Sequence, residues 1–293
     1  MSAAGCAAAP RPVRSSGRAG RSVWGPVALA LALAIACGGD PAGAALPPAG
    51  GGPPLDPSPW VAATDGTIPL VIVVSHGGSV APAWLPDRDC VACVTATDLK
   101  THELAIAIAD GFDRRVGARP FVVANLLHRR KFDANRAVAE ATGGHVPLEA
   151  MWTLFHARID SAKARALRQH PRALLIDLHG HGHPIARLEI GYLLTSGDLR
   201  APDAVLAPRF SAAGVAAVPS AAVPAPAAAD AYFSGGYNTW RHGSLGGGAV
   251  DAIQIESHYL GVRDTPAART AFAETFVTVL LQYLADHYDW RPA

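Results

Sequence analysis

The sequence predicts an α/β domain whose central sheet is mostly parallel and is flanked by helices. Short runs rich in Val, Ile and Leu, such as "IPLVIVV" and "ALLI", are apolar throughout, which is typical of strands buried on both faces. These runs alternate with longer segments whose apolar residues recur at helical intervals. Turn sequences typical of hairpins are lacking between the runs, so we expect crossover connections through helices.

The first half of the domain is expected to alternate strand, helix and strand. An apolar run beginning at Ile68 predicts a buried strand that delivers His76 to its carboxyl end. Residues 98–117 place apolar side chains at helical intervals and end on a glycine, which indicates a helix. Residues 119–127 ("RPFVVANLL") predict a second buried strand.

The second half is expected to continue this alternation. Residues 147–170 predict a long amphipathic helix that stops before a proline, and residues 172–180 predict a third strand. Residues 201–230 are mostly Ala, Pro and Val, and we expect them to form a long surface loop. Residues 249–263 begin as a strand. Residues 265–290 open with a Thr-Pro start signal and predict a closing helix.

The first 37 residues have the order of an export signal. Four arginines precede the apolar run "VWGPVALALALAIAC", which is too short and too weakly flanked for a membrane span. In "LAIACGG" a small residue precedes Cys37, which resembles a bacterial lipoprotein signal with Cys37 as the acylated residue. The spacing of Ala42 and Ala44 suits an ordinary signal peptidase instead. We therefore expect an exported protein, periplasmic or anchored to the membrane through Cys37, in preference to a disordered tail.

Composition divides the rest of the chain and limits its partners. Residues 38–66 are rich in Gly, Pro and Ala, which predicts a flexible linker before a folded domain at 67–293. Lys and Arg number 25 against 24 Asp and Glu, and no basic stripe is visible. A nucleic-acid partner therefore has no electrostatic support.

Two cysteines of the predicted domain lie close together in "CVAC". Cys90 and Cys93 could form a redox pair, half of a zinc site or a local disulfide. A second CxxC is lacking, so a structural zinc knuckle is incomplete. In an oxidising compartment a local disulfide is the favoured interpretation.

Polar side chains follow four of the predicted strands, at the point where each strand ends. These are His76, the segment "HRRKFDANR", Asp177 with His179, and Glu256. In open α/β sheets, ligands bind outside the carboxyl ends of the strands. A single histidine at a strand end is more often a hydrogen-bonded structural residue than a ligand. Four polar clusters converging on one edge are much harder to explain by packing.

The histidines suit a zinc ion. Imidazole nitrogen and carboxylate oxygen are ordinary zinc ligands, and a catalytic site keeps three protein ligands and an open position. Glu256 is the candidate base that would take a proton from water. Asp177 lies two residues before His179 on the same face of the strand, so it could orient that imidazole. His181 and His183 could be outer partners, substrate-facing residues or loop residues.

The order of the motifs resembles a known family. The series "SHGG…TD…RRKFDANR…DLHGHG…FSGGYNTWRHG…QIE" is similar to N-formylglutamate amidohydrolase, a relative of the zinc carboxypeptidases and of aspartoacylase. The resemblance covers about residues 68–285. It implies a single zinc-carboxypeptidase-like domain that cleaves the C–N amide bond of an N-acyl amino acid, or of a short peptide, with Zn²⁺ as cofactor.

The resemblance also implies roles for particular residues. His76 and His179 match metal-binding histidines, and Glu256 matches the glutamate that serves as base. Asn135 and Arg136 match the "DxNR" motif, in which a guanidinium can grip a substrate carboxylate.

The third metal ligand departs from the pattern of the zinc carboxypeptidases, because the glutamate that they place three residues after the first histidine is replaced by a serine here. The resemblance suggests Asp98, with His102 and Glu103 as rivals. Asp98 directly precedes the predicted helix, so a helix-capping role is an equal alternative.

Three further residues are implied near the substrate. Tyr237 follows a "GG" turn of the family's pattern, and His242 matches a histidine just after it. Arg129 could polarise the substrate carbonyl, although its position is shifted by one residue from the family's arginine. The alternative to an enzyme is a non-catalytic peptide- or peptidoglycan-binding protein of the cell surface. The presence of Glu256 and Arg136 favours an enzyme.

Overall fold

The computed structural model describes residues 56–293 apart from 91–92, 193–205 and 245–247. The predicted export signal, Cys37 and most of the predicted linker therefore lie outside the described residues. No helix within the described part of the chain is long and apolar enough to span a membrane.

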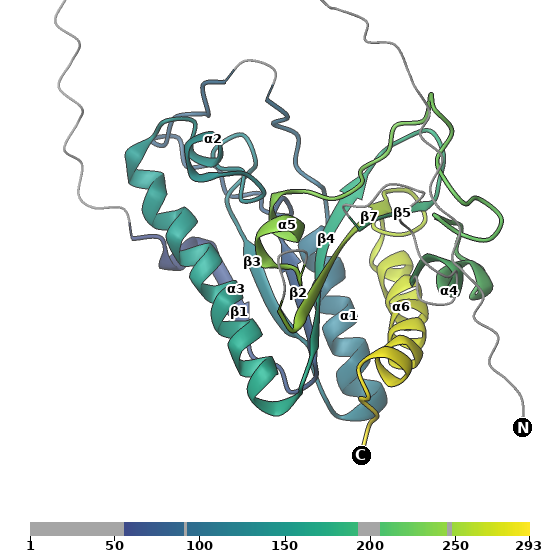
Figure 1. The fold of residues 1–293 in the computed structure, drawn as a ribbon. Helices are drawn as coiled ribbons and strands as arrows, with labels where there is room; N and C mark the ends of the chain where they lie inside the picture. The colour runs from purple at the N-terminus through teal and green to yellow at the C-terminus, as the bar shows by residue number, and fades with distance from the viewer. Residues whose placement is uncertain (1–55, 91–92, 193–205, 245–247) are drawn as a thin grey trace, which may run out of the picture. The chain divides into compact units, whose positions relative to one another are not determined.

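The described residues form one seven-stranded sheet with the strand order β1-β3-β2-β4-β7-β5-β6. The pairs β3–β2, β2–β4, β4–β7 and β5–β6 are parallel, whereas β1–β3 and β5–β7 are antiparallel. The predicted class, an α/β domain with a mostly parallel sheet, is confirmed (Figure 1). The strands are β1 (Val61–Thr64), β2 (Leu70–Val74), β3 (Phe121–Asn125), β4 (Ala173–His181), β5 (Leu188–Gly191), β6 (Ala217–Val218) and β7 (Val250–His258).

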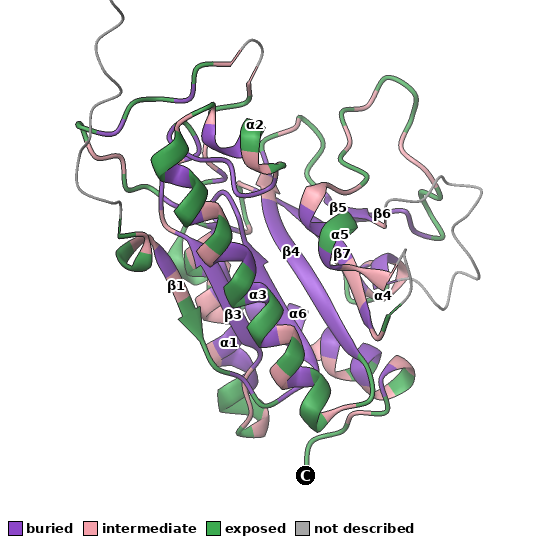
Figure 2. Cartoon of the chain, turned by 60° about the vertical axis from the view of Figure 1, so that its left-hand side comes forward, coloured by how far each residue is buried: buried purple, intermediate pink, exposed green. Residues whose placement is uncertain are grey.

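Helices cover both faces of the sheet. Helices α1, α4 and α6 share one apolar cluster with the sheet, and α3 packs with the opposite face (Figures 1 and 2). The α-helices are α1 (Thr101–Val116), α2 (Val138–Thr142), α3 (Glu149–Gln169), α4 (Leu206–Ala212), α5 (Tyr237–His242) and α6 (Pro266–His287). Two short 3₁₀ helices are η1 (Ser58–Trp60) and η2 (Val146–Leu148).

Strand β2 shows why the sequence forms a sheet with helices packed on both faces. Successive side chains of a strand point to opposite faces of its sheet. Leu70, Ile72 and Val74 lie in the cluster with α1 and α6, while Val71 and Val73 lie in the cluster with α3. All five are fully buried, which explains the continuous apolar run.

The ends of two helices follow the predicted signals. Helix α1 stops at Gly117, whose left-handed φ of 65° lets its N–H bond to the carbonyl of Asp113. Helix α6 begins after Thr265, whose side chain accepts a hydrogen bond from the N–H of Ala268. Pro266 occupies the first helical turn, where its missing N–H costs nothing.

The strand order creates a crevice at the carboxyl end of β2. From β2 the chain passes through α1 to β3 on one side of the strand. It then passes through α3, on the other face, to β4 on the opposite side of β2. Such a reversal separates the loops that leave adjacent strands and opens a binding site between them.

Two segments differ from expectation. The predicted linker contains η1 and β1, and β1 pairs antiparallel with β3, so the folded domain begins before residue 67. The predicted loop 201–230 contains α4 and β6. Phe210 of α4 is fully buried against Phe272 and Phe276. This apolar contact stabilises α4 in a segment whose alanine-rich composition did not predict a helix.

The loop that follows β2 carries a disulfide between Cys90 and Cys93, as the sequence predicted. The buried guanidinium of Arg88 lies beside both sulfurs and donates hydrogen bonds to the carbonyls of Arg129 and Val94. The disulfide thus belongs to a loop that is tied to the neighbouring loop after β3.

Candidate active site

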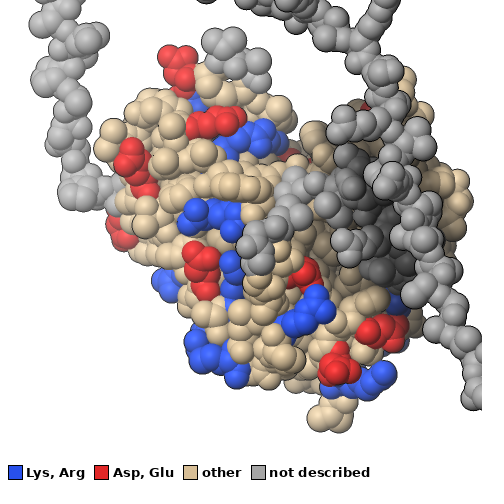
Figure 3. Space-filling view, in the orientation of Figure 1, with Lys and Arg blue, Asp and Glu red and all other residues tan. Residues whose placement is uncertain are grey.

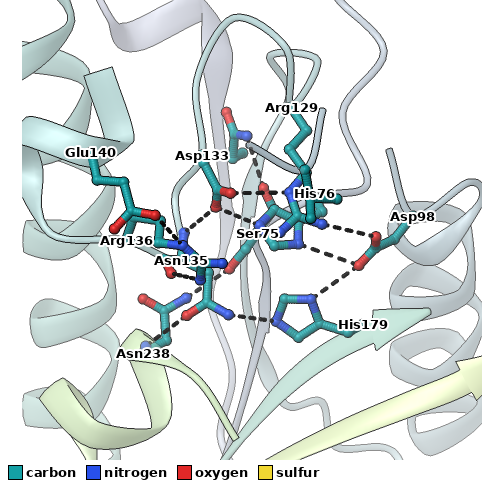
Figure 4. A network of polar contacts seen from close by, with 12 residues as sticks. Ser75, His76, Asp98, Arg129, Asp133, Asn135, Arg136, Glu140, His179 and Asn238 are labelled. Atoms are coloured by element: carbon teal, nitrogen blue, oxygen red, sulfur yellow. Dashed lines mark hydrogen bonds and ion pairs between the residues drawn. The ribbon is translucent and has the colours of Figure 1, made fainter. Parts of the chain in front are cut away.

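The carboxyl ends of β2 and β4 bring together residues far apart in the sequence. His76 follows β2 directly, and Asp98 lies in the loop between β2 and α1. Asp133 lies in the loop after β3, while Asp177 and His179 belong to β4. Because these strands are parallel, their ends meet at the crevice. Figure 4 shows the side chains of His76, Asp98 and His179 pointing toward one another.

Three of these residues form a compact group around one point. The Oδ2 atom of Asp98 lies 3.4 Å from Nδ1 of His76 and 3.0 Å from Nδ1 of His179 (Figure 4). One ligand atom from each residue lies within 4.8 Å of the other two. All three side chains are buried. A buried group of two imidazoles and one carboxylate at this spacing could hold a metal ion.

Carboxylates on the far side of each ring orient the two imidazoles. Nε2 of His76 lies 2.6 Å from Asp133, and Nε2 of His179 lies 2.9 Å from Asp177. When the Nε2–H of His76 donates to Asp133, the lone pair of its Nδ1 faces the shared point. Asp177 thus lies where the sequence suggested an orienting partner.

The Nδ1 atom of His76 provides a test of fit for a cation. It is buried and has no hydrogen-bond partner among the described residues. A buried nitrogen without a partner is costly, and a metal ion at the shared point would satisfy it. The donor set of two nitrogens and one carboxylate oxygen also matches the chemistry of zinc.

A second cluster along β4 and β5 fits a metal less well. His181, His183 and Glu189 also bring ligand atoms within 4.8 Å of one another. Nδ1 of His181 already accepts the N–H of His183, and its Nε2 donates to the carbonyl of Arg187. The guanidinium of Arg187 lies 3.5 Å from Glu189 and supplies positive charge there. We therefore assign the metal to the first group.

The electrostatics of the first group favour a positive charge at its centre. Burial opposes ionisation of Asp98, but the imidazoles of His76 and His179 outweigh it and hold the pKa of Asp98 below its usual range. Burial likewise opposes protonation of His179, yet Asp177 and Asp98 hold its pKa well above the usual range. A proton or a metal ion can supply the charge.

Glu256 lies on β7, directly across from His179 in the sheet register. Its side chain is buried, and Gln254 donates a hydrogen bond of 2.9 Å to its Oε1. Burial raises the pKa of Glu256 to about 7, with the negative charge of Asp98 adding to the effect and His179 opposing it. A carboxyl group with a pKa near neutrality is suited to exchanging protons with a substrate.

A cavity of about 550 Å³ connects these groups. His76, Asp98, His179 and Glu256 line its floor. Both the metal group and the predicted base therefore face the same space, and a substrate in that space could contact all four.

Three other predicted residues line the cavity on the side of β3. Arg129 donates to Asp133 and also lies 3.8 Å from Asp98, so its charge neutralises both carboxylates. Asn135 places its amide nitrogen 3.3 Å from His179. Arg136 is paired with Glu140 at 2.8 Å (Figure 4). It is also part of the cavity lining.

The predicted substrate residues Tyr237 and His242 lie outside the cavity lining. Helix α5 directs both toward α3, where Tyr237 contacts the rings of Trp152 and His156. His242 is buried with its Nε2 2.9 Å from Nδ1 of His156. The glycines before α5 do line the cavity, so the turn approaches the site while the side chains after it point away.

The two rivals of Asp98 are placed elsewhere. Glu103 is exposed and pairs with Lys100 at 2.8 Å, and His102 is not part of the metal group. The capping alternative for Asp98 does not hold, because no side chain caps the start of helix α1. The carboxylate of Asp98 contacts His179 instead.

Two site residues carried no separate signal in the sequence. Asp133 lies inside the "DANR" motif, two residues before Asn135, and its role depends on a contact with His76 that spans 57 positions. Asn238 donates to Ser75 and lies 3.4 Å from Asp177, which positions that carboxylate. Such contacts between distant segments follow from the topology and leave no mark in local spacing.

The fold and this site together define an α/β protein with a candidate metal centre in the crevice at the carboxyl end of β2, where the strand order reverses. No protein-family model and no curated protein matches the chain. Several solved structures are similar to this chain in fold. The gene product Atu2144 from Agrobacterium tumefaciens aligns with a TM-score of 0.56 and 15% identity, over 78% of this chain and 95% of the other.

The second similar structure is N-formylglutamate amidohydrolase from Ralstonia eutropha. It aligns with a TM-score of 0.56 and 12% identity, over 78% of this chain and 98% of the other. The resemblance inferred from the sequence motifs is thereby confirmed at the level of the fold.

Proposed function

We propose that this protein is a metal-dependent hydrolase that cleaves the C–N amide bond of an N-acyl amino acid or a short peptide, with zinc as the metal. The observation that carries the proposal is the convergence of His76, Asp98 and His179 on one point in the cavity that Glu256 also lines. The similarity in fold to an N-formylglutamate amidohydrolase supports the same class of reaction.

Metal binding and proton transfer are assigned to different residues of the site. When bound by His76, Asp98 and His179, a zinc ion would polarise the substrate carbonyl and acidify a water molecule. Glu256 accepts one proton from the attacking water, whose oxygen forms a new bond to the carbonyl carbon. The C–N bond then breaks, and Glu256 returns the proton to the departing amine nitrogen. The second proton of the water also passes to the amine, so the products are a carboxylate and an ammonium group.

The cationic side of the cavity selects the substrate. Arg136 retains donors beyond its pairing with Glu140, and a planar guanidinium can bind a carboxylate through two parallel hydrogen bonds. Asn135 borders the same space and can donate to the substrate from beside His179. Arg129, held by Asp133, is placed to stabilise negative charge on the carbonyl oxygen.

The location proposed for the protein rests on the sequence alone. We propose that the chain is exported and works in the periplasm or on the membrane, held there by a lipid on Cys37. Its partners would then be small N-acyl amino acids or peptides of that compartment. On the face shown in Figure 3, basic and acidic side chains are interspersed, which gives no support for a nucleic-acid partner.

The direct test is hydrolysis by the zinc-loaded protein. Release of free amine would be measured for a panel of N-acyl amino acids and dipeptides, alongside the Glu256→Gln variant. We expect turnover by the wild type. The variant should keep its zinc and lose activity by at least about a hundredfold, because an amide cannot accept the proton. Full activity in the variant would remove Glu256 from the mechanism, and an inert wild type would favour the binding protein.

A further inference from the structure

The cavity has two sides of different chemistry. Arg129 and Arg136 line it on the side of β3, beyond the metal group. Toward the ends of β7 and β5, the lining includes the apolar or aromatic side chains of Leu99, Phe233 and Tyr259. The buried guanidinium of Arg263 lies over the ring of Tyr259, 5.4 Å from its centroid, and donates to the carbonyl of Leu99. Because the strand order is β3-β2-β4-β7-β5, the metal group lies between the cationic side and the apolar side.

The apolar side is exposed in a way that suggests a ligand. Leu99 has 55% and Phe233 has 46% of its surface exposed. Exposed apolar side chains scattered over a convex surface need no explanation. Two of them on the wall of a concave site indicate a surface that an apolar group covers.

Glu189 fixes the aromatic part of this wall. This buried carboxylate contacts Nδ1 of His183 through one oxygen at 3.0 Å and accepts the N–H of Phe233 through the other at 3.3 Å. The rings of His183 and Phe233 stack, with centroids 5.3 Å apart. His181 accepts the N–H of His183 and so holds the loop that carries it. The second histidine cluster thus builds a rigid wall.

The size of the site points the same way. A cavity of about 550 Å³ falls in the range of roughly 300–1,000 Å³ that is typical for drug-sized ligands. A formyl group on the acyl side of the amide would leave the apolar wall uncovered, since it offers no apolar surface to bury.

We propose that the acyl portion of the substrate is a bulky apolar group, aryl-acyl or medium-chain acyl, that packs on Phe233 and Leu99. The amino-acid carboxylate faces Arg136, and the scissile carbonyl lies at the metal group between them. This inference rests on the proposed function for the bond that is cut, and it specifies the substrate class.

The test compares acyl groups on one amino acid with the zinc-loaded full chain. Values of kcat/KM for N-formyl-, N-acetyl-, N-octanoyl- and N-phenylacetyl-glutamate would be measured by amine release. We expect the phenylacetyl or the octanoyl compound to exceed the formyl compound by about tenfold or more, the range that burial of an apolar group produces. A preference for the formyl compound over both would overturn the inference.

Two variants test whether the preference for an apolar acyl group depends on Phe233. Phe233→Ala should lower the ratio of phenylacetyl to formyl kcat/KM by about tenfold. Trp84→Ala is the matched control, because Trp84 is an exposed aromatic residue outside the cavity lining, and it should leave the ratio unchanged. An unchanged ratio in Phe233→Ala would contradict the proposed contact.

A binding measurement separates this inference from the proposed function. Calorimetry with the zinc-loaded Glu256→Gln variant would compare N-phenylacetyl- and N-formyl-glutamate without turnover. Tighter binding of the phenylacetyl compound, lost in the added Phe233→Ala change, supports the apolar wall even if the wild type hydrolyses neither. Equal binding overturns the inference even if the wild type is an active hydrolase.

Discussion

The imidazoles of His76 and His179 lie on either side of the candidate metal position. A carboxylate lies beside the Nε2 atom of each ring. The carboxylates of Asp133 and Asp177 fix the rings of His76 and His179 through their Nε2 atoms. Asp133 is held in turn by Arg129. The metal group is therefore rigid before any ion arrives, because every ring has its orientation set by a charged partner.

A change at Asp133 tests this role. Asp133→Asn removes the charge that orients His76 while leaving a side chain of the same size. We expect the affinity for zinc to fall by about 10- to 100-fold without unfolding, as is typical when such a partner is lost. Competition with a chelator of known affinity measures the change. Glu103→Gln removes an exposed carboxylate nearby and should leave the affinity unchanged. Equal affinity in both variants would rule out the orienting role.

At the scale of single residues, the sequence predicted the strand-end positions of His76, His179 and Glu256 because each follows an apolar run. Asp133 was not predicted, since nothing local reveals its contact with His76. His242 was expected near the substrate because it matches a histidine of the family that the sequence resembles. The structure turns it toward α3, because helix α5 rotates successive side chains by about 100° each.

Secondary-structure elements that bury a continuous apolar face were the predictable ones. Strands β2, β3, β4 and β7 and helices α1, α3 and α6 all occur where the apolar pattern placed them. Strand β1 is a four-residue edge strand with a partner on one side only, and β6 has two residues. Such short elements are stabilised by tertiary contacts, so composition rich in Ala and Pro concealed them.

The start of α6 offers a test at the scale of an element. Thr265→Ala removes the side chain that accepts the N–H of Ala268, so one donor of the first turn loses its partner. We expect the free energy of unfolding to fall by about 1 kcal/mol, measured by urea denaturation. Thr270→Ala, an exposed threonine within the same helix, is the control and should change stability little. Equal losses in the two variants would argue against a capping role.

For the whole molecule, the topology explains why the site lies where it does. The order of the strands reverses at β2, because β3 lies on one side of β2 and β4 lies on the other. The loops after β2, β3 and β4 therefore meet at the crevice. Sequence patterns predicted the strands and the class of sheet, but the strand order depends on which faces pack together. The antiparallel placement of β5 beside β7, which brings the apolar wall to the cavity, had no signal in the sequence.

Acid stability provides a test of the packing between α3 and α5. Burial lowers the pKa of both His156 and His242 to about 3. The charges of His242 and Arg241 add to the effect at His156, and those of Lys163 and Arg241 add to it at His242. Both histidines are therefore neutral in the folded state at pH 5, whereas in the unfolded chain they gain protons below about pH 6.5. The unfolded state binds more protons between about pH 6.5 and 3. Stability is thus lost as the pH falls through this window, by up to about 1.4 kcal/mol per pH unit for each histidine.

The measurement is the free energy of unfolding between pH 7 and 4 for the wild type and for His242→Asn. The variant lacks one of the two titrating rings, and an asparagine at this position can still bond to His156. Its stability should therefore fall less steeply with decreasing pH than that of the wild type. Parallel curves would show that His242 does not gain a proton on unfolding.

The zinc content of the purified protein tests the central claim most directly. We expect about one zinc ion per chain in the wild type. The ion should be lost for the most part in His76→Ala and in His179→Ala, and retained in His183→Ala. Retention of zinc by His179→Ala together with its loss from His183→Ala would place the ion at the other histidine cluster and contradict the account.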